Sequence, residues 1–215
     1  MKLRIAIPIF VNCDLIDVTV PYDVLSRVPS YWKGEFDLKI VAESMELVRT
    51  AQGVELKPHA TFAEYATNPA TVLLVPGATD VSCALLDPFQ QFIKQQGATA
   101  QWVTSVCTGA IVLAHAGLLD GHMATTHWAG LDTLKKYKKV KVVNGYPRYV
   151  HDRNRLTGGG VSSSLDATLF LISQLTSEHV AKCAQLIVQY NPHPPFAGGD
   201  PCAADYHTYA TVAGG

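Results

Sequence analysis

Short apolar runs rich in β-branched residues alternate with segments of helical periodicity along most of this chain, and this alternation limits the fold more than any other feature. Leu3–Phe10 has the apolar density of a buried strand, whereas Asp17–Val28 places its apolar residues on one face of a helix. Strands that alternate with helices at this spacing form βαβ units, in which a parallel sheet is covered on both faces. We therefore predict one three-layer α/β/α domain with a mostly parallel central sheet over residues 1–190.

The other expected elements follow the same two patterns. Short apolar runs predict strands at Phe36–Ala42, within Leu47–Lys57 as a pair, and at Thr71–Val75, Gln101–Val106, Val140–Val143, Arg148–Val150 and Leu156–Gly160. Helical periodicity predicts helices at Val81–Gln96 with Gly97 as its stop, Thr108–Ala116, Trp128–Tyr137, Ser164–Leu175 and Ser177–Tyr190. Residues 191–215 are rich in Pro, Gly and Ala, and are expected to form an irregular C-terminal arm.

The amino-acid composition argues against several classes of protein. A hydrophobic fraction of 48% with 16% charged residues supplies enough apolar material for a large core and does not fit disorder. The 17 Lys and Arg residues against 18 Asp and Glu residues give a net charge of −1, so the chain lacks the cationic surface of a nucleic-acid-binding protein. The lysine-rich run Lys135–Lys141 is interpreted as a solvated helix end.

Cysteine and histidine spacing argues against a metal centre. The five cysteines are widely separated and the eight histidines are scattered, so no set has the spacing of zinc ligands. No run approaches the roughly 18 apolar residues of a membrane span, and no cleavage site follows the first apolar run. We expect a cytoplasmic protein with free thiols and with neither nucleic-acid nor membrane partners.

The segment Trp102–Leu113 (WVTSVCTGAIVL) holds the strongest chemical signal. A buried strand ends at Val106, Cys107 follows at the corner, and a helix begins with Thr108 and Gly109. Such a corner holds a nucleophile in a strained, exposed position, and the start of the helix stabilises a thiolate. Cys107 is therefore a candidate nucleophile, and the alternative is a small buried structural cysteine.

Two further segments are expected at the same edge of the sheet. The loop Pro76-Gly77-Ala78 follows the strand Thr71–Val75, and the amides of Gly77 and Ala78 are candidate donors to negative charge on a reacting atom. Asp17 lies just past the first strand at an expected helix start, where an N-cap is its ordinary role.

These segments, together with Ala124–Trp128 (ATTHW) and Thr157–Gly160 (TGGG), resemble the ThiJ/PfpI superfamily, whose flavodoxin-like fold is similar to that of the class-I glutamine amidotransferases. The resemblance extends from residue 3 to about residue 200. The aspartate in Leu15–Leu25 (LIDVTVPYDVL) and the tail Asn191–Pro201 (NPHPPFAGGDP) narrow it to the branch of isonitrile-hydrating enzymes.

The resemblance implies roles for particular residues. Cys107 would be the nucleophile, Asp17 its acid/base partner and Thr108 a neighbour of the sulfur, and the chemistry would need no metal or organic cofactor. The implied substrate pocket contains His127, Trp128, Gly160 and Val161. For His127 a structural role is the alternative. The resemblance also implies a homodimer.

Three positions depart from the family pattern. Ala78 takes the place of the second glycine of a Pro-Gly-Gly loop, and Val20 replaces a glycine before Pro21. Ser162–Ser164 follow the glycine triplet, where glycine and small apolar residues are usual. We expect the last two departures to alter the shape of the pocket.

The implied function is that of a hydro-lyase: cysteine-dependent hydration of an isonitrile, R–N≡C, to an N-substituted formamide through a thioimidate on Cys107. Two alternatives stay open at this point. One is a glyoxalase- or deglycase-type reaction on a reactive carbonyl. The other is a non-catalytic redox- or ligand-sensing module, because the sensor halves of AraC-type regulators resemble the same superfamily.

Overall fold

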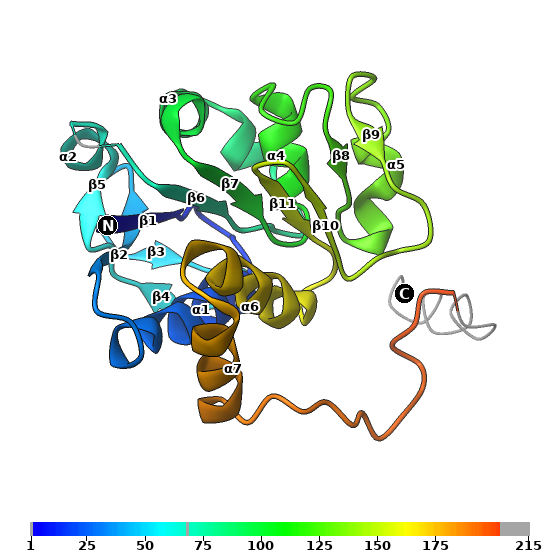
Figure 1. The fold of residues 1–215 in the computed structure, drawn as a ribbon. Helices are drawn as coiled ribbons and strands as arrows, with labels where there is room; N and C mark the ends of the chain where they lie inside the picture. The colour runs from blue at the N-terminus through cyan, green and yellow to red at the C-terminus, as the bar shows by residue number, and fades with distance from the viewer. Residues whose placement is uncertain (1, 68, 203–215) are drawn as a thin grey trace.

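The computed structural model describes residues 2–67 and 69–202, and a seven-stranded sheet runs through its centre (Figure 1). The strands of this sheet are β1 (Lys2–Pro8), β2 (Glu35–Ala42), β5 (Ala60–Thr61), β6 (Val72–Val75), β7 (Trp102–Ser105), β10 (Tyr149–Asp152) and β11 (Arg155–Gly158). Their order is β10-β11-β7-β6-β1-β2-β5, and neighbours are parallel except β10 and β11. Two-stranded sheets join β3 (Val48–Arg49) to β4 (Glu55–Leu56) and β8 (Met123–Ala124) to β9 (Lys141–Val142).

Helices cover both faces of the sheet (Figure 1). One layer contains α1 (Leu15–Ser26), α6 (Ser163–Leu175) and α7 (Glu178–Ile187), which contact one another. The other contains α3 (Phe89–Thr99), α4 (Gly109–His115) and α5 (Leu131–Leu134), with the short α2 (Phe62–Ala66) against α3. Within the described residues, three 3₁₀ turns complete the elements: η1 (Val28–Ser30), η2 (Ser82–Leu85) and η3 (Trp128–Gly130). The predicted three-layer arrangement with a mostly parallel sheet is confirmed.

The central strands are apolar on both faces because both faces are covered. All four residues of β6 are buried, and β1 is buried from Ile5 to Pro8. Strands of this kind lose the alternation of polar and apolar residues that marks a half-exposed strand. Among the described residues no helix has the length and apolar character needed to cross a membrane.

The prediction of one helix over Val81–Gln96 is wrong. Residues 82–85 form η2, and α3 begins only after Pro88, which occupies its N-cap position. Proline has no amide hydrogen and clashes with the preceding turn, which disfavours one continuous helix across residue 88. Gly97 does not stop α3 but lies inside it, where an added Cβ would approach Leu118 Cδ1 to within 2.4 Å. The glycine therefore allows close packing of α3 on Leu118.

The predicted helix Trp128–Tyr137 is also shorter than expected. The 3₁₀ turn η3 leads into α5, which ends at Leu134, and Gly130 stands at the junction. Glycine is a poor helix former, which agrees with the change of helix type there. All five lysines of Lys135–Lys141 are exposed, as predicted.

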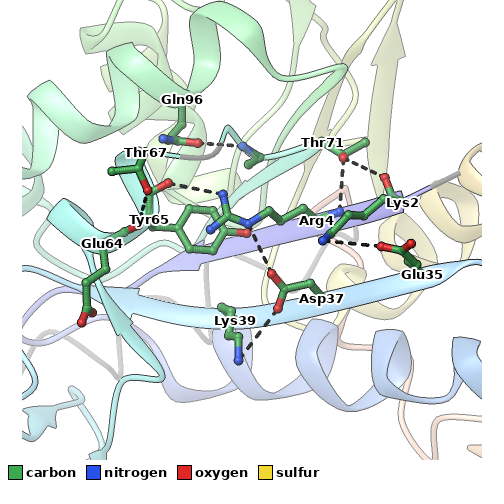
Figure 2. A network of polar contacts seen from close by, with 11 residues as sticks. Lys2, Arg4, Glu35, Asp37, Lys39, Glu64, Tyr65, Thr67, Thr71 and Gln96 are labelled. Atoms are coloured by element: carbon green, nitrogen blue, oxygen red, sulfur yellow. Dashed lines mark hydrogen bonds and ion pairs between the residues drawn. The ribbon is translucent and has the colours of Figure 1, made fainter.

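A polar network closes the amino-terminal edge of the sheet (Figure 2). Arg4 in β1 donates from Nε to Asp37 Oδ2 in β2 at 3.2 Å, and its guanidinium lies 3.6 Å from the centre of the Tyr65 ring. The Arg4 amide donates to Thr71 Oγ1, just before β6. Partly exposed ion pairs contribute at most about 1 kcal/mol each, so this network chiefly fixes how β1, β2 and β6 line up.

Residues 191–202 leave α7 without regular secondary structure, and residues 191–200 are all exposed (Figure 1). The rest of the predicted C-terminal arm, residues 203–215, lies outside the described residues.

Candidate active site

Three loops meet at the carboxyl-terminal edge of the sheet, opposite the Arg4 network. Asp17 follows β1, Gly77 follows β6, and Cys107 follows β7. These strands are neighbours in the sheet, and the helices after β1 and β7 lie on opposite faces of it (Figure 1). In parallel sheets this is the place where ligands bind. The structure thus brings together three segments that are up to 90 residues apart in the sequence.

Cys107 is held in an unusual backbone conformation. Its φ angle is 55°, in the left-handed region that costs a residue with a side chain about 1–2 kcal/mol. Its amide donates to the carbonyl of Gly159 at 2.9 Å, and its carbonyl accepts from Thr126 Oγ1 at 2.8 Å. The predicted strain at this corner is therefore confirmed. The predicted exposure is wrong, since only 7% of Cys107 is accessible.

Asp17 is not the N-cap of α1. Asp14 occupies that position and accepts from the amide of Ile16, while Asp17 lies in the first turn. The Asp17 side chain is fully buried, and its Oδ2 accepts from the Gly77 amide at 2.9 Å. Its other oxygen, Oδ1, has no hydrogen-bond partner in the part of the chain that the structure describes. The carboxyl group is therefore buried against the Gly77 loop, with one oxygen engaged there.

Asp17 and Cys107 lie close enough to shift each other's proton affinity. Burial raises the pKa of Asp17 to about 7, and the Asp14 charge adds to this, although the Gly77 amide and the Cys107 side chain oppose it. Burial followed by the Asp17 charge also raises the pKa of Cys107, against hydrogen bonds from the backbone and side chain of Thr108. The start of the helix was expected to stabilise a thiolate, and burial together with the Asp17 charge acts against this by raising the pKa of Cys107.

Thr108 lies beside the sulfur, as predicted, and links it to the neighbouring loop. Its Oγ1 accepts from the Ala78 amide at 2.8 Å and donates to the Ala78 carbonyl at 2.6 Å. Gly77 and Ala78 were predicted as amide donors to a reacting atom. In this structure both amides are engaged, by Asp17 and by Thr108, so these contacts weigh against that role.

Gly77 is the point at which the loops touch. A Cβ at this position would lie 2.6 Å from both the amide nitrogen and Oγ1 of Thr108, and 3.0 Å from Asp17 Oδ2. We expect Gly77→Ala to lower the free energy of unfolding by about 1–3 kcal/mol and to displace both side chains, because a packed interior accepts extra volume only with strain. Thermal or denaturant unfolding measures this cost. Gly199→Ala, which has open space around it, is the control; an equal loss in both variants contradicts the expectation.

Three of the predicted pocket residues lie together, with Gly160 and Trp128 around the His127 ring. His127 is half-buried, and an added Cβ on Gly160 would meet its ring at 3.2 Å. The Trp128 ring is tilted by 38° against the His127 ring, with ring centres 5.0 Å apart. His127 Nδ1 accepts from the Ala129 amide, and burial lowers the pKa of the ring, so the neutral ring carries its proton on Nε2. Val161 follows Gly160 and packs against the core.

One of the three serine departures, Ser163, has a structural explanation. Ser162 is the N-cap residue of α6, and the Ser163 hydroxyl donates to the carbonyl of Gly160. Ser163 therefore ties the glycine triplet to the start of α6, whereas the Ser162 side chain makes no capping hydrogen bond and the Ser164 hydroxyl has no hydrogen-bond partner among the described residues. Val20 is half-buried and packs against the core.

Sequence reasoning missed the residues that hold the corner in place. Thr126 belongs to the ATTHW segment, but nothing in its sequence context predicts that its hydroxyl donates to the Cys107 carbonyl. Asp14 and Gln52, bonded to each other at 2.9 Å, lie 38 residues apart. The one sequence feature that could have pointed to Asp14 is its position three residues before Asp17 at the same helix start.

The five cysteines are free thiols, as predicted. Within residues 2–67 and 69–202, no three His, Cys, Asp or Glu side chains are grouped as the ligands of a metal ion would be.

Comparison with known proteins identifies the family. Residues 3–174 match the DJ-1/PfpI family. Isonitrile hydratase of Pseudomonas putida is 38% identical over 205 residues, which cover 95% of this chain and 86% of that protein. The crystal structure of a ThiJ/PfpI family protein from Pseudomonas syringae is similar with a TM-score of 0.88 and 33% identity, over 99% of this chain and 85% of that chain.

A further relative has another activity. The HTH-type transcriptional regulator CdhR of Pseudomonas aeruginosa is 33% identical over 92 residues, 42% of this chain and 27% of that protein. The likeness to the hydratase covers far more of both proteins than the likeness to the regulator does. On the extent of these matches, the chain belongs to the DJ-1/PfpI family.

Proposed function

We propose that this protein hydrates isonitriles to N-substituted formamides, with Cys107 as nucleophile and Asp17 as acid and base. The observation that carries the proposal is the buried Asp17 carboxyl beside the Cys107 thiol, with a pKa of about 7. A base works best when its pKa lies near the working pH, and an ordinary aspartate is too weak a base for a thiol. The likeness to isonitrile hydratase over 95% of the chain supports the choice of substrate.

The first half of the reaction forms a covalent intermediate. The Asp17 carboxylate takes the thiol proton, and the Cys107 sulfur attacks the terminal carbon of R–N≡C. Asp17 then gives its proton to that carbon, which yields a thioimidate, R–N=CH–S–Cys107. A soft sulfur nucleophile suits the compact, uncharged isonitrile carbon, and the step needs one nucleophile and one proton carrier.

The second half releases the product. Water adds to the thioimidate carbon while Asp17 moves one proton from the water to the nitrogen. The tetrahedral adduct then loses the C–S bond, and its hydroxyl proton returns to sulfur. The net change is R–N≡C plus H₂O to R–NH–CHO, with the thiol and the carboxylate restored.

A formamide assay tests this proposal. The purified protein is incubated with a small panel of aliphatic and aromatic isonitriles, and formamide is followed by chromatography, with methylglyoxal in a parallel reaction. Formamide produced well above the protein-free rate supports the proposal. Lactate from methylglyoxal without formamide assigns the carbonyl reaction instead. Stoichiometric loss of one thiol under mild peroxide, with no turnover, assigns a sensor.

We also propose that the protein is a homodimer in a reducing compartment, the cytoplasm. The five free cysteines fit such a compartment, where disulfides seldom form.

A further inference from the structure

The corner that carries Cys107 is held by one hydrogen bond on each side of the residue. The peptide group before it is fixed because the Cys107 amide donates to the Gly159 carbonyl at 2.9 Å. The peptide group after it is fixed because Thr126 Oγ1 donates to the Cys107 carbonyl at 2.8 Å. Gly159 acts through its main chain, whereas Thr126 acts through a hydroxyl that a substitution can remove.

The Thr126 hydroxyl is itself firmly placed. Thr126 is 2% exposed, and the amide of Thr125 beside it donates to Thr157 Oγ1 at 2.9 Å. Thr157 belongs to β11 and pairs with Ser105 of β7, the strand that leads into the corner. The segment that carries Thr126 is therefore fixed to the same part of the sheet as Cys107.

The Thr126 bond also fixes the direction of the Cys107 side chain. Rotation about φ, the N–Cα bond, swings the Cβ and the carbonyl group together, because both are attached to Cα. With the preceding peptide group held by Gly159, a fixed carbonyl therefore means a fixed Cβ and a φ angle of 55°. This left-handed conformation is strained for a residue with a Cβ, so it persists only where its surroundings impose it.

The helix after the corner does not impose this conformation on residue 107. Thr108 is the N-cap of α4, and the helical hydrogen bonds begin at the Thr108 carbonyl, one residue beyond Cys107. The stabilisation from one buried hydrogen bond and the strain of one left-handed residue are of similar size. Loss of the Thr126 hydroxyl can therefore shift residue 107 toward a relaxed conformation.

We propose that Thr126 is a positioning residue for the nucleophile: its hydroxyl holds Cys107 in the left-handed conformation that places the thiol in the site with Asp17. The part of this inference that concerns catalysis rests on the proposed function. Thr126 is not a catalytic residue, because its hydroxyl acts on the main chain of Cys107. Misplacing a reacting group by about 1 Å costs up to about 100-fold in rate, so loss of the hydroxyl should lower kcat and leave KM nearly unchanged.

A double-mutant cycle on stability tests the backbone part without substrate. Thr126→Val keeps the shape of the side chain and removes the hydroxyl, and Cys107→Gly removes the strain because glycine adopts positive φ freely. In the Cys107 background, relief of strain partly offsets the loss of the hydrogen bond. In the glycine background there is no strain to relieve, so Thr126→Val should raise the unfolding equilibrium constant at least about threefold more there. Equal effects in both backgrounds overturn the inference. Thr126→Ala takes the place of Thr126→Val if the valine variant does not fold.

Thr104→Val is the matched control. Thr104 is also 2% exposed, and its hydroxyl donates to the Leu73 carbonyl at 3.1 Å, between β7 and β6. Its loss should have the same effect on stability in both backgrounds, because this bond does not act on residue 107.

Formamide kinetics test the catalytic part. Thr126→Val should lose at least about tenfold in kcat, and Thr126→Ser, which keeps the hydroxyl, should recover most of this loss. Thr104→Val should keep kcat within a factor of about two of the parent, and the same result for Thr126→Val overturns the positioning role. If the parent itself forms no formamide, the proposed function fails, whereas the double-mutant cycle still decides whether Thr126 holds Cys107 in its strained conformation.

Discussion

Replacing Cys107 with alanine is expected to reduce formamide formation at least about 1,000-fold, to the protein-free rate, because the variant lacks the sulfur on which the proposed thioimidate forms. The fold should survive. Alanine keeps the Cβ, so the backbone strain is unchanged, and the two hydrogen bonds at the corner use only main-chain atoms of residue 107. The rate of formamide production tests the loss of activity, and a thermal melt tests whether the fold survives.

The control for this variant is Cys83→Ala, since Cys83 is an exposed thiol outside the site and its removal should leave the rate unchanged. A second measurement looks for the intermediate. Acid quenching during turnover should trap a mass increase equal to the isonitrile on the peptide that contains Cys107. Alkylation is a poorer probe, because Cys107 is buried while Cys83 and Cys202 are exposed. Parent-level turnover by Cys107→Ala would show that the mechanism is wrong.

Asp17→Asn should have the second largest effect, and it should act on activity and stability in opposite directions. The amide keeps the size of the side chain and an oxygen for the Gly77 amide, but it cannot carry a proton between sulfur, carbon and nitrogen. Loss of such a proton carrier costs on the order of 100-fold or more in rate. Formamide kinetics across the pH range measure this loss, and a variant within a factor of a few of the parent contradicts the assigned role.

The stability effect follows from the raised pKa of Asp17. In the unfolded chain this group loses its proton near pH 4, whereas in the folded protein it keeps the proton up to about pH 7. The folded state therefore binds more protons between these values, and the parent loses stability as the pH rises, by up to about 1.4 kcal/mol per pH unit. Asp17→Asn lacks this loss, so its free energy of unfolding should gain on that of the parent between pH 4 and pH 7. Parallel curves in denaturant titrations would contradict the raised pKa.

The sequence alone predicts those elements that are determined by residues close together in the chain. Buried parallel strands such as β6 must be apolar throughout, and a strand followed at once by Cys107 and a helix defines the corner. Local signals fail where distant segments decide. In the sequence Gly97 looks like the end of a helix, but it lies inside α3, where it makes room for Leu118. Asp17 looks like an N-cap, but Asp14, three residues earlier, occupies that position.

The burial of Cys107 is also decided by segments that are distant in the sequence. The accessible area of Cys107 depends on the loops that follow other strands, and the sequence around residue 107 does not predict where those loops lie. The same holds for its partner, because the contact of Asp17 with Gly77 spans 60 residues. Three loops had to be placed against one another before the proton affinities of the pair could be known.

The left-handed backbone at residue 107 also restricts how this site can change in evolution. Threonine serves as a nucleophile in other enzymes, but a β-branched side chain is a genuine outlier at positive φ, so that exchange is closed here. Glycine and asparagine, by contrast, fit this conformation with less strain and bring no nucleophile. A single substitution at residue 107 can therefore relieve the backbone strain and at the same time remove the proposed nucleophile.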